Sequence, residues 1–123
     1  MKSETISVMI VEHQPMMLTA LSTTLSSAGM TILDEVMDGK KALTLASKRT
    51  PSLILYSVRV PSLDDLEQIA ALRREFPNTR ILALVTGEFS GQVNTALDYG
   101  AHRVLTKTAH RLEILNTVRA MAQ

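Results

Sequence analysis

Apolar and polar residues form blocks along the chain, and the blocks switch between two periods. Five short runs are largely apolar or β-branched, which is typical of strands buried in a sheet. These runs are Ile6–Val11, Thr31–Val36, Leu53–Ser57, Arg80–Val85 and His102–Thr106. We therefore predict five strands, with the unbroken run Leu53–Ser57 at the centre.

Between and after these runs, apolar residues recur every three or four positions, which predicts amphipathic helices. The first helix begins at Pro15, which suits a first turn, and ends near Gly29, which suits a left-handed cap. Asp38 is expected to cap the second helix, from Gly39 to Arg49. The other three are marked by Leu66, Ile69, Leu72 and Phe76, by Val93, Ala96 and Leu97, and by Leu112, Ile114, Leu115, Val118 and Met121.

The alternation of five strands and five helices predicts an α/β fold. Crossovers between parallel strands are right-handed, so helices should cover both faces of a (βα)5 doubly wound, five-stranded parallel sheet of order 2-1-3-4-5. In this order the loops after the first and third strands open into one crevice. The residues at or just past the strand ends there are Glu12, His13, Ser57, Val85, Thr86 and Lys107.

The composition fits one domain over residues 1–123. The 13 Lys and Arg residues nearly cancel the 12 Asp and Glu residues, so no strong field recruits nucleic acid or an anionic membrane. There is no cysteine, which excludes disulfides and thiolate zinc sites. No apolar run approaches the ~20 residues of a membrane span and no signal peptide opens the chain, so we expect a soluble, cytoplasmic protein.

A hydrolase is the first alternative for the crevice, with Ser57 as nucleophile, His13 as base and Glu12 nearby. The residues around Ser57 do not form the Gly-X-Ser-X-Gly turn that exposes a nucleophilic serine, and no oxyanion loop is evident. The adjacent side chains of Glu12 and His13 are also expected to point in different directions. We therefore predict that the protein is not an enzyme and that Ser57 fills a tight pocket.

A magnesium site is the second alternative, because magnesium prefers several oxygen ligands that include one or two carboxylates. The crevice offers the Glu12 carboxylate, a backbone carbonyl near Arg59 and a hydroxyl, and His13 is a poor ligand for a hard cation. We expect no cofactor, with magnesium binding weak or absent. Glu12 is expected to pair with Lys107 as a structural contact instead.

A nucleotide site is the third alternative. The chain after the first strand reads Glu12-His13-Gln14-Pro15, without the glycines that let a backbone approach phosphates. Asp38-Gly39-Lys40-Lys41 is a capped helix start with solvated lysines. Neither segment supports nucleotide binding.

Four blocks at the strand ends together resemble a known family. They are Val8–Pro15, Asp38–Leu43, Pro51–Pro61 and Gly100–Lys107. Their spacing is similar, from end to end, to that of the receiver domain of bacterial two-component response regulators, especially the NarL/LuxR type. The resemblance implies the flavodoxin/CheY-like fold and a role in two-component signal transduction and transcription regulation.

The resemblance also implies a phosphorylation site, from which this sequence departs. Two acidic residues of the family that help to hold magnesium correspond to Glu12 and His13, so one carboxylate remains. The phosphoacceptor aspartate of the family falls on Ser57. A serine hydroxyl without a base nearby is not activated, and phosphoryl transfer needs magnesium to neutralise the developing charge.

The switch positions of the family are changed as well. The switch threonine or serine at the end of the fourth strand falls on Val85, with Thr86 one residue later, and the aromatic switch position falls on Val104. Slipping the strand by one residue to present Thr86 would send every side chain of the strand to the opposite face. Only the family's lysine, at Lys107, is retained unchanged.

These departures predict a pseudo-receiver, a regulatory domain that acts through protein–protein contacts without phosphorylation. The alternative is a receiver that is still phosphorylated on Ser57, Asp64 or Asp65 with residual magnesium. Asp64 and Asp65 follow Ser62 as first-turn acids of a helix. They lie beyond Pro61, too far along the loop to replace the strand-end carboxylate easily.

The resemblance also suggests partners. It implies a histidine kinase or another regulatory protein, and a DNA-binding helix-turn-helix domain beyond Gln123, so DNA contact is expected only through that domain. Receivers of this type pair through the first helix, the fifth helix or the face of the fourth. The last predicted helix has more apolar residues than one buried stripe requires, which favours a homodimer. They are Ile114, Leu115, Val118 and Met121.

Overall fold

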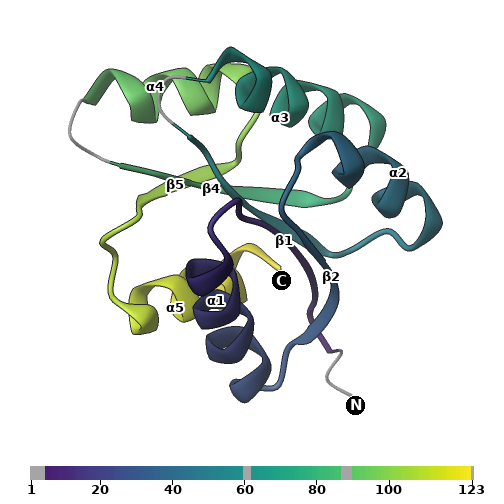
Figure 1. The fold of residues 1–123 in the computed structure, drawn as a ribbon, viewed down its shortest axis with the longest axis vertical. Coiled ribbons are helices and arrows are strands. Elements are labelled where there is room, and N and C mark those ends of the chain that lie inside the picture. The colour runs from purple at the N-terminus through teal and green to yellow at the C-terminus, as the bar shows by residue number, and fades with distance from the viewer. Residues whose placement is uncertain (1–4, 60–61, 87–89, 123) are drawn as a thin grey trace.

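The structure, a computed structural model, describes residues 5–59, 62–86 and 90–122. Strands and helices alternate along the chain (Figure 1). The strands are β1 (Ser7–Val11), β2 (Thr31–Val36), β3 (Leu53–Ser57), β4 (Arg80–Val85) and β5 (Arg103–Thr106). The helices are α1 (Pro15–Ser27), α2 (Lys40–Lys48), α3 (Leu63–Glu75), α4 (Ser90–Tyr99) and α5 (Arg111–Met121).

The strands form one parallel sheet of order β2-β1-β3-β4-β5, so the predicted fold class is confirmed. Val11 of β1 lies opposite Tyr56 of β3, and Ser57 lies opposite Leu84 of β4. Because the strands are parallel, their carboxyl ends meet at the same edge of the sheet.

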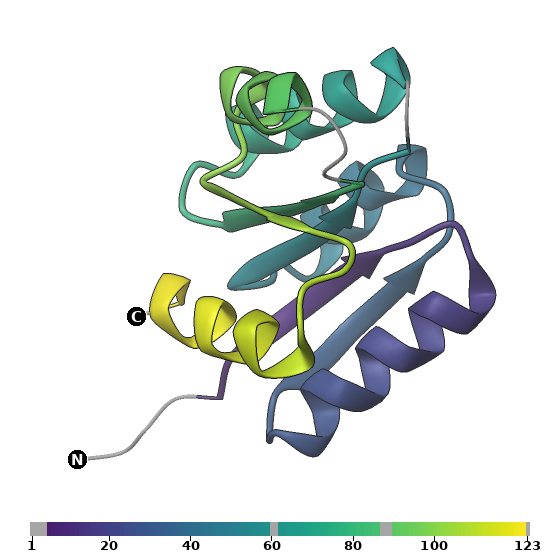
Figure 2. The same cartoon turned by 90° about the vertical axis from the view of Figure 1, so that its left-hand side faces the viewer.

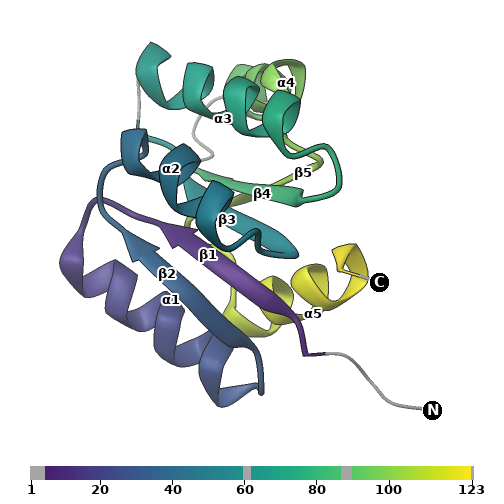
Figure 3. The ribbon, with the colours of Figure 1, turned by 90° about the vertical axis from the view of Figure 1, so that its right-hand side faces the viewer.

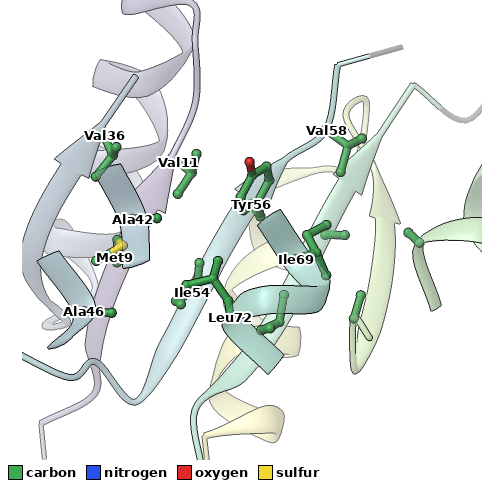
Figure 4. Packing of buried hydrophobic residues seen from close by; sticks show 14 of the residues in the cluster. Met9, Val11, Val36, Ala42, Ala46, Ile54, Tyr56, Val58, Ile69 and Leu72 are labelled. Atoms are coloured by element: carbon green, nitrogen blue, oxygen red, sulfur yellow. The ribbon is translucent and has the colours of Figure 1, made fainter. Parts of the chain in front are cut away.

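Helices cover both faces of the sheet. α1 and α5 lie on one face, and α2, α3 and α4 lie on the other (Figures 1, 2 and 3). Side chains of each strand alternate between the two cores. Ile54 and Tyr56 of β3 pack in the core that includes α2 and α3 (Figure 4), whereas Leu53 and Leu55 join the core with α1 and α5. Every residue of β3 is buried, as predicted for a central strand.

The predicted signals at the helix ends are confirmed with small shifts. Pro15 is the first residue of α1, and Gly29 after its end has a φ of +91°, in the left-handed region. The N-cap of α2 is Gly39 rather than the predicted Asp38, because the helix begins one residue later, at Lys40. Asp38 precedes the cap, and its Oδ1 atom accepts a hydrogen bond of 3.0 Å from the Lys40 N–H. In the described part of the chain, no helix has the length and hydrophobicity needed to cross a membrane.

The apolar residues of α4 and α5 are arranged differently from the prediction. Leu97 and Leu112, expected on buried faces, are 41% and 57% exposed. The other marked residues of α5 are all buried, so the inference that they are surplus to the core is wrong. α5 packs against both the sheet and α1, and a helix in that position buries a wide stripe. The buried residues are Ile114, Leu115, Val118 and Met121.

Candidate functional site

The carboxyl edge of the sheet gathers the polar residues that the sequence singled out. Glu12 follows β1, Ser57 ends β3 and Lys107 follows β5. Backbone hydrogen bonds extend beyond the strand ends: the Glu12 N–H donates to the carbonyl of Val36 (2.8 Å), and the Lys107 N–H donates to that of Val85 (2.6 Å). The main chain therefore fixes these positions, and the predicted common edge is confirmed.

Glu12 is buried at this edge, with 1% of its surface exposed. Its Oε2 atom accepts a hydrogen bond of 3.0 Å from the Gln14 N–H and lies 3.4 Å from the Nδ1 atom of His13, a contact that is not a hydrogen bond. The Oε1 atom has no hydrogen-bond partner among the described residues. The prediction that the side chains of Glu12 and His13 point apart is wrong. The hydrogen bond from the Gln14 N–H holds the Glu12 carboxylate within the β1–α1 loop, where it contacts His13.

Lys107 does not form the predicted pair with Glu12. No carboxylate in the described ranges lies within ion-pair distance of the Lys107 ammonium. The reason is the same hydrogen bond to Gln14, which holds the Glu12 carboxylate within the β1–α1 loop. Glu12 and Lys107 instead line a common cavity of about 170 Å³ on the side of α1 and α5.

Ser57 ends β3 with a buried hydroxyl. The residue is 3% exposed, and its Oγ atom has no hydrogen-bond partner among the described residues. No hydrogen bond joins His13 to Ser57, and the His13 Nδ1 atom lies beside Glu12. A serine nucleophile needs an adjacent base, so this arrangement gives no support to the hydrolase alternative.

Neither residue at the expected switch position near the end of β4 offers a free hydroxyl. Val85 is 1% exposed and lies opposite Thr106. Thr86 follows the strand, and its hydroxyl donates a hydrogen bond of 2.7 Å to the side-chain oxygen of Gln92 in α4. β4 has therefore not slipped to place Thr86 at the strand end. Val104 is half-buried and packs against the core under α2, α3 and α4.

A buried polar cluster beside Ser57 was not predicted. Asp65, in the first turn of α3, is 3% exposed and accepts hydrogen bonds from the Arg59 backbone N–H (2.8 Å), Nε (3.0 Å) and Nη2 (2.9 Å). It also accepts a hydrogen bond of 3.2 Å from the Tyr56 hydroxyl. Ser62 caps α3 by accepting from the Asp65 N–H. The cluster ties α3 to β3 at the residue before Ser57.

Burial, hydrogen bonds and charges shift the pKa values of all three residues in this Tyr56–Asp65–Arg59 cluster. Burial raises the pKa of the Tyr56 hydroxyl, and the negative charge of Asp65 raises it further. Burial opposes ionisation of Asp65, but the hydrogen bonds and charge of Arg59 outweigh it and lower the pKa of the carboxyl. The hydrogen bond to Asp65 also raises the pKa of Arg59. Asp65 is therefore an ionised carboxylate with both oxygens engaged.

One signal in the sequence could have revealed this cluster. Asp65 lies four residues before Ile69 and seven before Leu72, which places it on the buried stripe of α3. An acid on a buried stripe needs a partner, and the preceding strand and loop supply hydrogen-bond donors in Tyr56 and Arg59. Reading Asp65 only as a first-turn acid concealed this role.

Comparison with known proteins identifies the family. Residues 8–119 match the response regulator receiver domain. The chain belongs to this family. It is 27% identical over 120 residues to the nitrate/nitrite response regulator protein NarL of Escherichia coli, a match that covers 97% of this chain and 56% of NarL. It is 28% identical over 116 residues to the response regulator protein VraR of Staphylococcus aureus, covering 94% and 56%. This receiver chain thus spans about half the length of the curated relatives it matches.

Solved receiver domains share the fold. The signal receiver domain of the response regulator NarL from Mycobacterium tuberculosis is 29% identical and superposes with a TM-score of 0.88 over 98% of both chains. A chemotaxis protein from Vibrio cholerae is 25% identical, with a TM-score of 0.85 over 96% of this chain and 99% of that one. The flavodoxin/CheY-like receiver fold and the similarity to NarL-type receivers are confirmed.

Proposed function

We propose that this receiver domain is a pseudo-receiver, which acts through protein–protein contacts and does not depend on phosphorylation. The observation that carries the proposal is the buried Ser57 hydroxyl, without a base, at the position where the resemblance places the phosphoacceptor aspartate. A carboxylate is already ionised at neutral pH, whereas a serine hydroxyl must lose its proton to attack phosphorus. A serine phosphate ester would also lack the reactivity of an aspartyl phosphate, so the signal would not reset itself.

The second part of the proposal is that magnesium binding is weak or absent. Magnesium requires near-octahedral oxygen coordination and is usually held by carboxylates. Of the two positions that the resemblance assigns to acids, Glu12 has one oxygen engaged by the Gln14 N–H, and the other is His13. Within the described ranges, no three His, Cys, Asp or Glu side chains are grouped as metal ligands would be. This donor set is a poor fit to the ion.

The alternative, a receiver still phosphorylated on Ser57, Asp64 or Asp65, has weaker support. Both oxygens of Asp65 are engaged by Arg59 and Tyr56, and Asp64 is exposed on α3. Asp65 is therefore not free to take over the reaction, and Asp64 lies at the solvent-exposed surface of the helix.

The proposed partners are a histidine kinase or another regulatory protein, a second copy of the chain and, through a separate effector domain, DNA. The family and the greater length of NarL and VraR support these proposals. For a homodimer through α1, α5 or the α4 face, exposed Leu97 on α4 and Leu112 on α5 replace the buried stripe of α5 as the supporting residues.

The proposal is tested by restoring the missing groups. Two-dimensional NMR spectra are recorded for the wild-type chain and for the triple variant His13→Asp, Ser57→Asp and Val85→Thr, each titrated with beryllofluoride and magnesium. We expect no saturable shifts in the wild type and saturable shifts at the carboxyl edge of the variant. Saturable shifts at Glu12 and Ser57 in the wild type would contradict the proposal.

A further inference from the structure

The loop between α4 and β5 is held by contacts from two neighbouring elements, α3 and β4. α3 and α4 lie side by side on one face of the sheet, in which β5 pairs with β4 (Figures 1 and 2). From α3, the Arg73 Nη1 atom donates a hydrogen bond of 2.7 Å to the carbonyl of Gly100. Gly100 has a φ of +125°, and a Cβ atom there would lie 3.0 Å from the Arg73 Cβ, so this close approach requires a glycine.

His102 connects the same loop to β4. Its main-chain N–H donates a hydrogen bond of 2.9 Å to the carbonyl of Ile81, and its Nδ1 atom accepts one of 3.0 Å from the Ile81 N–H. Both main-chain groups of Ile81 are therefore bonded to one residue, and the imidazole supplies the acceptor that the N–H needs. Because Nδ1 must present a lone pair, the ring is neutral and carries its proton on Nε2.

A second proton on the ring would break this bond. A protonated imidazole has an N–H on both nitrogens and no acceptor left for the Ile81 N–H. Two donors would then face each other, so the ring would turn away and leave the Ile81 N–H without its partner. The contact between His102 and the Ile81 N–H therefore forms only while the imidazole is neutral.

The surroundings of the ring oppose its protonation. Burial lowers the pKa of His102, and the positive charges of Arg73 on α3 and Arg80 on β4 lower it further. The next residue on β5 is Arg103, and the charged residue of α4 is Asp98. No carboxylate in the described ranges, Asp98 included, lies within ion-pair distance of His102. The contact is therefore closed at neutral pH.

Hydrogen bonds connect this loop to the last turn of α4. The N–H of Gly100 donates to the carbonyl of Leu97 at 3.0 Å, and the N–H of Ala101 donates to that of Ala96 at 3.1 Å. Ala96 is buried in the core, whereas the Leu97 side chain is 41% exposed. The position of this exposed leucine therefore depends on the loop that His102 connects to β4.

We propose that His102 is an acid-sensitive latch, which holds the start of β5 and the last turn of α4 in place while it is neutral and releases them when it is protonated. This inference deepens the proposed function, because it supplies a signal that needs no phosphate and acts on the α4 face. It rests on that function only in that the exposed Leu97 supports pairing through this face. Ser57 and magnesium take no part in the latch.

The experiment follows the amide signals of the isotope-labelled chain by two-dimensional NMR between neutral and mildly acidic pH. We expect the signals of Ile81 and of residues 97–103 to shift with one midpoint, below the ordinary imidazole pKa of about 6.5. The hydrogen-exchange protection of the Ile81 N–H should fall about tenfold for each pH unit below about 6.5, until the ring of the closed latch is itself protonated. The signals of α2, which contains no histidine, serve as the reference and should keep their positions.

Matched variants identify the titrating group. His102→Asn keeps an acceptor for the Ile81 N–H and does not titrate, so it should abolish the transition. His110→Asn is the control and should leave the transition unchanged. The His110 Nδ1 atom accepts a similar hydrogen bond of 3.1 Å, from the Leu112 N–H at the exposed start of α5, where asparagine also caps a helix well. Arg80→Gln removes one opposing charge and should move the midpoint up toward about 6.5.

Three results would each overturn the inference. They are Ile81 signals and protection that do not change with acid, a transition that survives His102→Asn, and a transition that disappears in His110→Asn. A transition shared by α2 would also overturn it, because acid would then unfold the whole chain rather than open the latch. These measurements contain neither a phosphoryl donor nor magnesium, so their outcome is separate from the test of the proposed function.

Discussion

The Arg59 guanidinium donates two parallel hydrogen bonds to the Asp65 carboxylate, from Nε to Oδ2 at 3.0 Å and from Nη2 to Oδ1 at 2.9 Å. The Asp65 side chain is buried while that of Arg59 is 47% exposed, so solvent screens the ion pair itself. The bonds that Asp65 accepts from the Tyr56 hydroxyl and the Arg59 backbone N–H lie deeper. If Asp65 lost these two bonds, the Tyr56 hydroxyl and the Arg59 N–H would be left without a hydrogen-bond acceptor.

The first prediction concerns this carboxylate. Asp65→Asn should lower the free energy of unfolding by about 1–3 kcal/mol, because it removes the charge and one acceptor from buried donors. Asp64→Asn, on the exposed neighbouring position, should cost less than about 1 kcal/mol, through the helix dipole alone. Urea unfolding of both variants measures the difference, and equal losses would contradict a role for the cluster.

The same carboxylate makes acid stability testable. Its pKa is lowered in the folded chain, so the folded state binds fewer protons than the unfolded state at acidic pH. This contribution to stability is complete above the unfolded pKa of about 3.9 and is lost as the pH falls through the lower folded pKa. Asp65→Asn should therefore flatten the loss of stability below about pH 4.

The second prediction concerns the close approach of α2 to Tyr56. A Cβ atom on Gly39 would overlap the Tyr56 hydroxyl, although the backbone conformation there, with a φ of −58°, suits any residue. Gly39→Ala should therefore destabilise the chain by about 1–3 kcal/mol through overpacking. Adding Tyr56→Phe should recover part of this loss.

A control for this variant lies in α4. Gly91→Ala introduces a Cβ with no atom within 4 Å and should stabilise the chain by about 0.4–1 kcal/mol, because it reduces the entropy of the unfolded state. Thermal unfolding compares the variants. If Gly39→Ala did not change the thermal stability, Tyr56 would not be held in place by its hydrogen bond to Asp65.

Much of the fold could be predicted from local signals. The run Leu53–Ser57 is buried on both faces, so its apolar pattern is continuous and its position in the sheet follows. The exposure of Leu97 and the burial of all four apolar residues in α5 depend on how each helix sits against its neighbours, which periodicity along one helix does not contain.

The candidate site could be predicted only in part. Strand ends placed Glu12, Ser57 and Lys107 at one edge, because that follows from topology alone. The directions of the side chains at this edge do not follow from the topology of the sheet. The Gln14 N–H draws Glu12 away from Lys107, and a single backbone donor of this kind leaves no pattern in the sequence.

The third prediction concerns the pH dependence conferred by His102. Its Nδ1 atom accepts a hydrogen bond of 3.0 Å from the Ile81 N–H, and burial, together with Arg73 and Arg80, lowers its pKa. The folded state therefore binds fewer protons than the unfolded state. This contribution to stability is complete above about pH 6.5 and is lost as the pH falls through the lower folded pKa.

His102→Asn provides the comparison, because an amide oxygen can accept the same hydrogen bond and does not titrate. Denaturant unfolding between neutral and mildly acidic pH should show a smaller loss of stability in the variant than in the wild type. His13 and His110 are present in both chains, so the difference between the two curves reports on His102. If the free energy of unfolding depended on pH in the same way in both chains, the prediction would be contradicted.

The fourth prediction concerns the hydroxyl of Ser57, at the position where the resemblance places the phosphoacceptor. Ser57→Ala should leave stability unchanged or raise it by up to about 1 kcal/mol, because the buried Oγ atom has no partner to lose. Ser7→Ala is the matched control. Its hydroxyl contacts the Ser52 Oγ at 2.9 Å and accepts from the Ser52 N–H, so its removal should cost about 1 kcal/mol. Equal losses of stability in Ser57→Ala and Ser7→Ala would show that the Ser57 hydroxyl forms a hydrogen bond.

The central claim, that this receiver takes no phosphate, is tested most directly by incubating the purified chain with acetyl phosphate and magnesium and measuring its intact mass. The triple variant His13→Asp, Ser57→Asp and Val85→Thr serves as the positive control. We predict that the wild-type mass stays unchanged while the variant gains one phosphate. A wild-type chain that carried a phosphate in substantial yield would contradict the claim.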